Sequence, residues 1–470
     1  MIKQFARKLQ AYVHNAIRSS SWPAVCVVAC ACAWLVFVVA LYYPGTPTRD
    51  TLGQLQQALD GSIDNWKPAL YAYILQGLNA LFGKGNLAAA FLMQACMFAC
   101  GYALIVYSFA RRERAYLWAM PFIFLFNEKG IDTNVIGNDA LCAACFLVFF
   151  GIVLVCRQAA GRKAKRFLYV LAFVFLFVGF VMRHNSFPAV VVMAMFALFP
   201  ICKGKIKTFC CAVALAAVFA FVNALFVNVV CNIRPTYPLR FAYAVDMVNI
   251  SILNNKWEPF CIEEQVRVGE ALPPPASYCL LRADVCNFYS TGFNPYYRDA
   301  SSETLKSIND SYFKGWLETV SRHPAQYAFL KGYFFHQFLL AGRSLPLFES
   351  FIASSYPHVS TYGGTICHNW RAWCNLRFVL NSLVPLIAYA SLFIVVLHLV
   401  RKRGRISPDV RDAMFMIGAA GAYVSTFTIF TLSSSEARFY IITSSLCCIA
   451  AIILAIKIAI IMIRRFCRAD

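Results

Sequence analysis

Residues 23–42 read PAVCVVACACAWLVFVVALY and contain no charged side chain. As an α-helix this run would be about 30 Å long, which matches the hydrocarbon core of a lipid bilayer. It ends without the small residues of a cleavage site for a signal peptide, so we expect it to remain in the protein as a span. Because 60% of all residues are hydrophobic and only 14% are charged, we expect the chain to cross the membrane many times.

Apolar runs along the rest of the chain bring the predicted number of spans to about ten. Five of them are nearly as long as the first run or longer, at residues 87–110, 208–230, 378–400, 413–431 and 437–463. Four are shorter, at residues 115–126, 139–156, 167–182 and 187–202. The sequence therefore predicts an all-α polytopic membrane protein with about ten transmembrane helices, helices at the outer interface and one large extracytoplasmic loop.

The positions of the basic residues predict the topology. The formal net charge is +21, and its distribution over every second gap between spans argues against a nucleic-acid-binding patch. The basic clusters are KQFARKLQ at 3–10, RRER at 111–114, RQAAGRKAKR at 157–166, KGKIK at 203–207, RKRGR at 401–405 and RRFCR at 464–468. By the positive-inside rule these clusters are cytoplasmic, and so are both ends of the chain.

The other gaps then face outward, at residues 43–86, 127–138, 183–186, 231–377 and 432–436. This alternation requires that the apolar run at 68–82 does not cross the membrane, so we predict an interfacial helix that begins at Pro68. The run at 326–341 contains Lys331 and His336, and the cost of burying these side chains in lipid favours a second interfacial helix over a span.

The topology divides the chain into four parts. Residues 1–22 form a cytoplasmic segment, 23–230 an N-terminal membrane module with the first and second outer loops, 231–377 the large extracytoplasmic loop, and 378–470 a C-terminal membrane module.

Most of the twenty cysteines lie in predicted spans, where cysteine packs as a small apolar residue. Six lie in the large outer loop: Cys231, Cys261, Cys279, Cys286, Cys367 and Cys374. An even number in an oxidising compartment predicts up to three disulfides, and free buried thiols are the alternative. No Cys-x-x-Cys pair outside the membrane has histidines at zinc spacing, which argues against a zinc site.

The first outer loop carries the leading candidate for chemistry, Asp50 in TPTRDTLGQLQQAL. A base that serves a polar substrate must stand at the membrane surface, and Asp50 follows the first span closely. The alternative is structural: Thr48, Asp50 or Thr51 is suited to cap the helix that follows, and acids serve well at helix N-termini.

The same region resembles the GT-C superfamily of membrane glycosyltransferases, which includes the protein O-mannosyltransferases and the lipid A aminoarabinose transferases. In that group an acid in the first outer loop is followed by a Lys/His-Pro-Pro-Leu-like stretch that ends in Phe-Gly. The counterparts here are Asp50, KPAL at 67–70 and Phe82-Gly83. The likeness covers about the first 160 residues. The chain departs from the pattern at Ala69, where the family often has a second proline, and at Thr51, where many members have Glu, so the sugar and the acceptor stay open.

The resemblance implies transfer of a sugar from a polyprenyl-phosphate donor to a hydroxyl of a glycan, lipid or protein. Asp50 would be the general base, and Lys67, Arg183 and Arg438 would hold the departing phosphate. Arg183 and its neighbour His184 lie in one very short outer connection, and Arg438 lies in another. The alternative is that these arginines are interface anchors that extend toward water.

The second outer loop supplies Glu128, Asp132 and Asp139. In the family an acid of this loop contacts the acceptor, or a divalent metal in some branches, so we include Asp132 and Asp139 among the substrate-binding candidates. Asp139 begins the next span, where an acid also favours the helix dipole. No cofactor is implied with certainty, and a divalent metal stays open because Asp139 suits either role. The outer histidines (His184, His336, His358 and His368) show no ligand spacing, which argues against them as metal ligands.

Two other classes of function compete with the transferase. A transporter or lipid flippase usually needs ionisable residues inside its spans or broken helices in paired repeats, and the six longest runs contain no acid and only one lysine, Lys457. A polymerase or ligase of polyprenyl-linked glycans shares the many spans and the large outer loop. The early acid and the Lys-Pro helix favour a transferase in a bacterial inner membrane.

We predict that residues 43–86 and 231–377 share one side of the membrane, and that RKRGR lies on the other side. In a cysteine-depleted variant, single cysteines at positions 50 and 402 should react with an impermeant thiol reagent from opposite sides. Labelling of both positions from the same side would show that the topology and the outer location of Asp50 are wrong.

Overall fold

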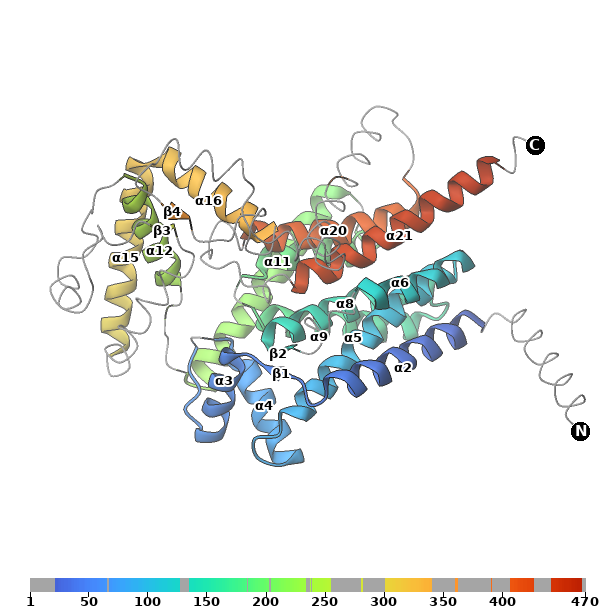
Figure 1. Ribbon diagram of the computed structural model, residues 1–470, viewed down its shortest axis with the longest axis horizontal. Coiled ribbons are helices and arrows are strands. Elements are labelled where there is room, and N and C mark those ends of the chain that lie inside the picture. The colour runs from blue at the N-terminus through green and yellow to red at the C-terminus, as the bar shows by residue number, and fades with distance from the viewer. Residues whose placement is uncertain are drawn as a thin grey trace, which may run out of the picture.

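The computed structural model is almost entirely helical (Figure 1). It describes residues 22–65, 67–126, 135–183, 185–202, 204–233, 237, 239–254, 280–281, 301–339, 360–361, 390, 406–426 and 441–466. The helices of the first half are α2 (Trp22–Tyr42), α3 (Arg49–Asp60), α4 (Ala69–Phe82), α5 (Leu87–Ala110), the 3₁₀ helix η1 (Arg114–Trp118), α6 (Ala119–Phe126), α8 (Asn138–Gln158), α9 (Arg162–Val181), α10 (Phe187–Leu198) and α11 (Lys205–Leu225), which continues into the π-helical turn η2 (Phe226–Val230). They are followed by α12 (Leu239–Asn254), α15 (Ser302–Arg322), α16 (Pro324–Leu339), α20 (Pro408–Thr426) and α21 (Ile441–Phe466). Two short parallel strand pairs join β1 (Thr46–Pro47) to β2 (Val135–Ile136) and β3 (Leu280–Leu281) to β4 (Ser360–Thr361).

Within the described residues, six helical segments are long and apolar enough to cross a membrane: Trp22–Tyr42, Leu87–Ala110, Asn138–Gln158, Arg162–Val181, Lys205–Val230 and Ile442–Arg464. They indicate an all-α multi-pass membrane protein. The predicted run at 115–126 forms η1 and the 8-residue α6, and the run at 187–202 forms the 12-residue α10. The run at 413–431 falls on α20, which ends at Thr426, and the run at 378–400 lies outside the described residues apart from position 390. The total of ten spans therefore stays a prediction.

Helix α8 lies at the centre of the bundle, packed against α5, α9 and α21 (Figure 1). Its most apolar window is 94% buried, whereas that of α2 is 22% buried. Glycine allows the close approach of its neighbours: a Cβ on Gly151 would lie 2.5 Å from Cβ of Leu104 on α5. A Cβ on Gly179 of α9 would lie 2.5 Å from Cε1 of Phe146 on α8. The bundle is thus assembled around one enclosed helix.

The bundle has two ends, which we name the Asp139 end and the Arg157 end after the charged residues of α8. At the Arg157 end, ion pairs join Arg112 to Asp409 at 2.9 Å and Arg464 to Glu113 at 2.7 Å. Basic segments from distant parts of the sequence therefore meet at one end, as the alternation of basic gaps predicts. Figure 1 shows α3, α4, β1 and β2 at the opposite end.

Helix α4 has only 14 residues and packs against α3 and the start of α5 at the Asp139 end. Pro68 is its N-cap residue, in agreement with the predicted start of a helix at this proline. The helix lies at this end together with α3 and does not run along the bundle beside α5 (Figure 1).

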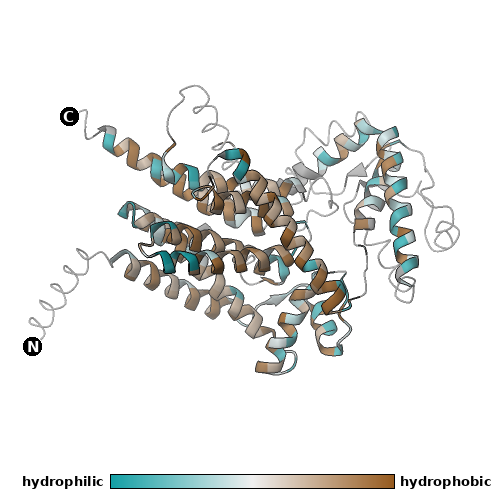
Figure 2. Cartoon of the chain, turned by 180° about the vertical axis from the view of Figure 1, so that it is seen from behind, coloured by the Kyte–Doolittle hydropathy of each residue, from teal (hydrophilic) through white to brown (hydrophobic). Residues whose placement is uncertain are grey.

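Helices α12, α15 and α16 pack together beside the bundle (Figure 1). Figure 2 shows that α15 carries many hydrophilic residues, whereas the bundle helices are largely hydrophobic. Lys331 of α16 is buried, and an ion pair compensates its charge: its Nζ lies 2.7 Å from Oδ1 of Asp246 on α12. Trp316 Nε1 donates a hydrogen bond of 3.0 Å to the other oxygen of that carboxylate. The charge that argued against a span at 326–341 thus has a partner inside this group of helices.

The disulfide prediction is tested here only at Cys231, which is a free cysteine. The five other cysteines of the large outer loop lie outside the described residues. Cys231 therefore does not take part in a disulfide, and pairing among the other five cysteines stays a prediction.

We predict that Gly151→Ala destabilises the protein by about 1–3 kcal/mol, since the added methyl group overlaps Leu104. Gly77→Ala in α4 is the matched control, because a Cβ there has no atom within 4 Å. The control should be neutral or stabilising by up to about 1 kcal/mol, since glycine is unfavourable inside helices. Unfolding of both variants in mixed detergent micelles measures the difference, and equal stability would contradict the close packing of α5 on α8.

Candidate functional site

Asp50 lies in the first turn of α3, and it is not the residue that caps the helix. Thr48 is the N-cap: its backbone is extended and its hydroxyl accepts a hydrogen bond of 3.1 Å from the amide of Thr51. Of the three N-cap candidates named from the sequence, Thr48 is confirmed, and the interpretation of Asp50 as the N-cap is wrong. The carboxylate still benefits from the helix dipole, and its side chain is available for an interaction outside the helix.

That interaction is an ion pair with Lys67. The lysine Nζ lies 2.9 Å from Oδ2 of Asp50, and the two side chains are 24% and 25% exposed. Gln54 holds the geometry, because its Nε2 donates a hydrogen bond of 3.1 Å to the carbonyl of Pro68 and so joins α3 to the start of α4. The candidate base and a candidate phosphate ligand are thus direct partners at the edge of the bundle.

The second outer loop is attached to the first by the β1–β2 pair, in which Thr46 is opposite Val135 and Pro47 is opposite Ile136. The hydroxyl of Thr51, next to Asp50, donates a hydrogen bond to the carbonyl of Ile136. These contacts link the N-terminal turn of α3 to the segment that leads directly into α8.

Helix α5 and a glycine support the same junction. Gln94 of α5 donates a hydrogen bond of 2.8 Å to the carbonyl of Val135. Gly45, just before β1, has φ of +89°, and a Cβ there would lie 2.8 Å from the ring of Phe91 and 2.9 Å from the side chain of Ile136. Only glycine fits this close approach in the left-handed region.

Asp139, in the first turn of α8, forms an ion pair with Arg183, which follows α9. The two side chains are 7% and 12% exposed, so this pair is buried more deeply than Asp50 and Lys67. Asn138 brings the helix ends together, because its side chain donates a hydrogen bond of 3.2 Å to the carbonyl of Met182. The arginine is therefore held inside the protein and does not extend to the interface as an anchor.

Burial alone would lower the pKa of Arg183, but the Asp139 carboxylate reverses this effect and the pKa lies above its ordinary value. Tyr423, Cys142 and Asp50 act in the same direction as Asp139. The interaction with Asp50 shows that the two ion pairs lie within electrostatic reach of each other. Four candidate residues from two outer loops and a helix end thus converge at the Asp139 end.

Sequence reasoning missed two tyrosines near this group. Tyr71 of α4 is 1% exposed, and burial, followed by the nearby Asp139, raises the pKa of its phenol above the ordinary value. Tyr71 lies in the first turn of α4, but Lys67 precedes the helix, so helical spacing does not link the two residues. Tyr423 of α20 is fully buried and interacts with Arg183, and no local pattern identifies it.

Several predicted site residues lie outside the described part of the chain: Asp132, His184, Arg438 and the additional acid Glu128. Among the residues that the structure describes, no group of three or more His, Cys, Asp or Glu side chains could hold a metal ion. What can be evaluated is the set of Asp50, Lys67, Asp139 and Arg183.

This set combines two carboxylates with two cations at one end of the bundle. A partly exposed carboxylate is able to accept a proton from a substrate, and a neighbouring ammonium is able to bind an anionic group. Comparison with models of protein families, with curated proteins and with solved structures gives no match.

We predict that Asp139→Asn destabilises the protein by about 3–5 kcal/mol, because Arg183 would stay buried without its counter-charge. Glu318→Gln is the control, since it breaks an exposed ion pair with Arg322 on α15 and should change stability by no more than about 0.5 kcal/mol. Denaturant unfolding of the purified variants compares the two. Equal effects would mean that the pair at the Asp139 end is solvated.

Proposed function

We propose that this chain is an integral membrane glycosyltransferase that moves a sugar from a polyprenyl-phosphate-linked donor to an acceptor hydroxyl. The proposal rests on the ion pair between Asp50 and Lys67, which is partly exposed and lies at the end of an apolar helix bundle. We place the reaction at the outer face of a bacterial inner membrane, with both termini cytoplasmic. The first-loop motif that resembles GT-C transferases contains both residues.

In the proposed reaction the donor phosphate competes with Asp50 for the Lys67 ammonium. Separation of the pair leaves the Asp50 carboxylate free to accept the proton of the acceptor hydroxyl. The hydroxyl oxygen forms a bond to the anomeric carbon while the bond from that carbon to the phosphate oxygen breaks. The charge left on the polyprenyl phosphate is held by Lys67, so donor binding and activation of the base are coupled through one lysine.

The surroundings of the ion pair suit a substrate with a lipid tail. Large apolar side chains of α3 and α4 are exposed: Leu52 and Leu59 at 50% and 42%, and Leu81 and Phe82 at 78% and 59%. Such side chains favour a location among lipid head groups and acyl chains. A polyprenyl chain would then remain in the bilayer while its phosphate reaches Lys67 from the side.

The position of the charged residues supports a transferase over a transporter. The charged side chains of α8 are Asp139 and Arg157. They are eighteen positions apart, which corresponds to about 27 Å along the helix, so one lies at each end. The residues between them are apolar or small. A transport site is expected near the middle of the membrane instead.

We predict that Asp50→Asn lowers sugar transfer by about 10²-fold or more, because the amide cannot accept the proton. Asp60→Asn, the same change on the exposed C-terminal turn of α3, is the control and should keep normal transfer. Glycolipid and polysaccharide extracted from cells with and without the chain identify the missing sugar, and membranes with matched amounts of each variant then measure transfer. If Asp50→Asn transferred normally, Asp50 would not be the base.

We predict that Lys67→Ala raises the donor concentration required for half-maximal transfer by at least about tenfold, since it removes a phosphate partner. Lys84→Ala, at an exposed position after α4, is the control. The products of the same assay also test the alternative function. Extension of one lipid-linked chain by many units, instead of transfer to a separate acceptor, would show that the protein acts as a polymerase. Unchanged donor dependence would remove Lys67 from the site.

A further inference from the structure

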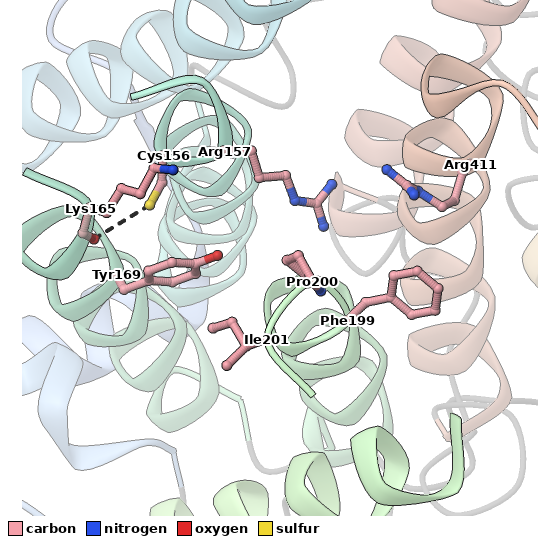
Figure 3. A pocket seen from close by; sticks show the side chains of 8 residues that line it. All are labelled: Cys156, Arg157, Lys165, Tyr169, Phe199, Pro200, Ile201 and Arg411. Atoms are coloured by element: carbon pink, nitrogen blue, oxygen red, sulfur yellow. Dashed lines mark hydrogen bonds between the residues drawn. The ribbon is translucent and has the colours of Figure 1, made fainter. Parts of the chain in front are cut away.

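A cavity of about 480 Å³ opens at the Arg157 end of the bundle, opposite the candidate site (Figure 3). It lies between the end of α8, the start of α9, the residues after α10 and the start of α20. Its lining residues are Cys156, Arg157, Lys165, Tyr169, Phe199, Pro200, Ile201 and Arg411. The volume lies within the range of about 300–1,000 Å³ that is usual for small-molecule sites.

The lining is strongly basic. Figure 3 shows Arg157 and Arg411 on facing sides of the space, on α8 and α20, with Pro200 and Ile201 nearby. Lys165 is the third cation, and the described lining residues include no carboxylate.

The carboxylates closest to the cavity are shared among several cations. Asp412 is fully buried and receives Arg157 and Arg112 at 2.8 Å on its two oxygens. Asp409 is bound by Arg112 at 2.9 Å and by Lys457 at 2.8 Å. The two carboxylates thus face four cations, which are Arg112, Arg157, Arg411 and Lys457. The cluster therefore keeps an excess of positive charge on the side of the cavity.

Two donors at the cavity make no hydrogen bond to any described residue. They are the buried Nε atoms of Arg157 and Arg411. The Nε of Arg411 lies 3.5 Å from Asp412, which is within ion-pair range but is too long and poorly aligned for a hydrogen bond. Arg157 is otherwise fixed, because its guanidinium lies 3.9 Å from the centre of the Phe196 ring and bonds to the carbonyl of that residue. Both guanidinium groups are thus paired with the single carboxylate of Asp412, which leaves a net positive charge that favours an anion in the cavity.

The surface around the opening is apolar. Ile201 is 56% exposed and Phe199 is 37% exposed. If α8 spans the membrane, Arg157 lies at the level of the lipid phosphates, since the helix segment from Asp139 matches the hydrocarbon thickness of about 30 Å. A basic cavity next to exposed apolar side chains suits a ligand with both an anionic head and an acyl chain.

We propose that this cavity binds the phosphate-bearing head group of an anionic phospholipid. Lys165 and Arg411 contact the phosphate at the opening, Arg157 faces it from the inner wall, and the acyl chains lie against the exposed side chain of Ile201. Binding would tie α9 to α20 by placing one anion between their cations. The site is separate from the candidate transferase site and does not depend on it.

The test uses the full chain purified in a neutral detergent, with thermal unfolding as the readout. Phosphatidylglycerol should raise the unfolding midpoint in a saturable way, and phosphatidylcholine with the same acyl chains should have little effect. In the double variant Lys165→Gln/Arg411→Gln, the phosphatidylglycerol concentration for half of the effect should rise at least about tenfold. Lys163→Gln, an exposed position on the same helix that does not line the cavity, should behave as the unmodified chain.

A second variant covers the case in which the double variant does not fold. Ile201→Glu adds a negative charge at the opening without removing a cation, and Ile206→Glu, at an 81% exposed position, is its control. Only Ile201→Glu should weaken the effect of phosphatidylglycerol.

Inorganic phosphate distinguishes the source of the anion. Stabilisation by phosphate alone, equal to that by phosphatidylglycerol and lost in Ile201→Glu, would keep the anion site but overturn its assignment to a lipid. If the cavity variants and their controls lost the stabilisation by phosphatidylglycerol equally, diffuse surface charge would explain the effect. If no variant lost this stabilisation, the lipid would bind elsewhere. Either result would overturn the proposal.

Discussion

Helix α8 is enclosed by protein along its length, and each of its ends carries a charge that requires a partner. Asp139 pairs with Arg183 at one end, and Arg157 pairs with Asp412 at the other at 2.8 Å. A slide along the axis or a rotation of α8 would separate at least one buried pair, which costs several kcal/mol. The rest of the bundle therefore takes its register from this helix: α9 is set by Arg183, which follows it, and α20 is set by Asp412. The separation of eighteen positions gives a length of about 27 Å that suits a bilayer.

The positions of the candidate site residues also depend on α8. Strand β2 leads into α8, and its pairing with β1 positions the segment from which α3 begins. Asp50 is thus connected to the core through a strand pair and the hydroxyl of Thr51, and not through a free loop. Functional side chains perform best on elements whose own position is fixed by packing and hydrogen bonds. The position of Asp50 therefore depends on the packing of α8.

The sequence predicted the helices well where physics demands a long apolar run, as in α2, α5 and α21, and less well at 115–126 and 187–202, where the helices are short. It also nominated Asp50, Lys67, Asp139 and Arg183 as site residues. It did not predict that they form two ion pairs, because pairing depends on how loops from different helices meet. The network at the Arg157 end was missed for the same reason: Arg112 was read as a topology signal, and its partner Asp409 is 297 positions away.

This separation along the chain matters during synthesis. Arg112 and Arg157 enter the membrane while Asp409 and Asp412 have yet to be translated, since the partners are 297 and 255 positions apart. In that interval the two guanidinium groups rely on water and lipid phosphates at the membrane surface. The arrival of α20 exchanges these temporary partners for carboxylates that make directed, short hydrogen bonds. The N-terminal helices are therefore inserted early but are locked together late, and until α20 arrives the positive charges of Arg112 and Arg157 lack these carboxylate partners.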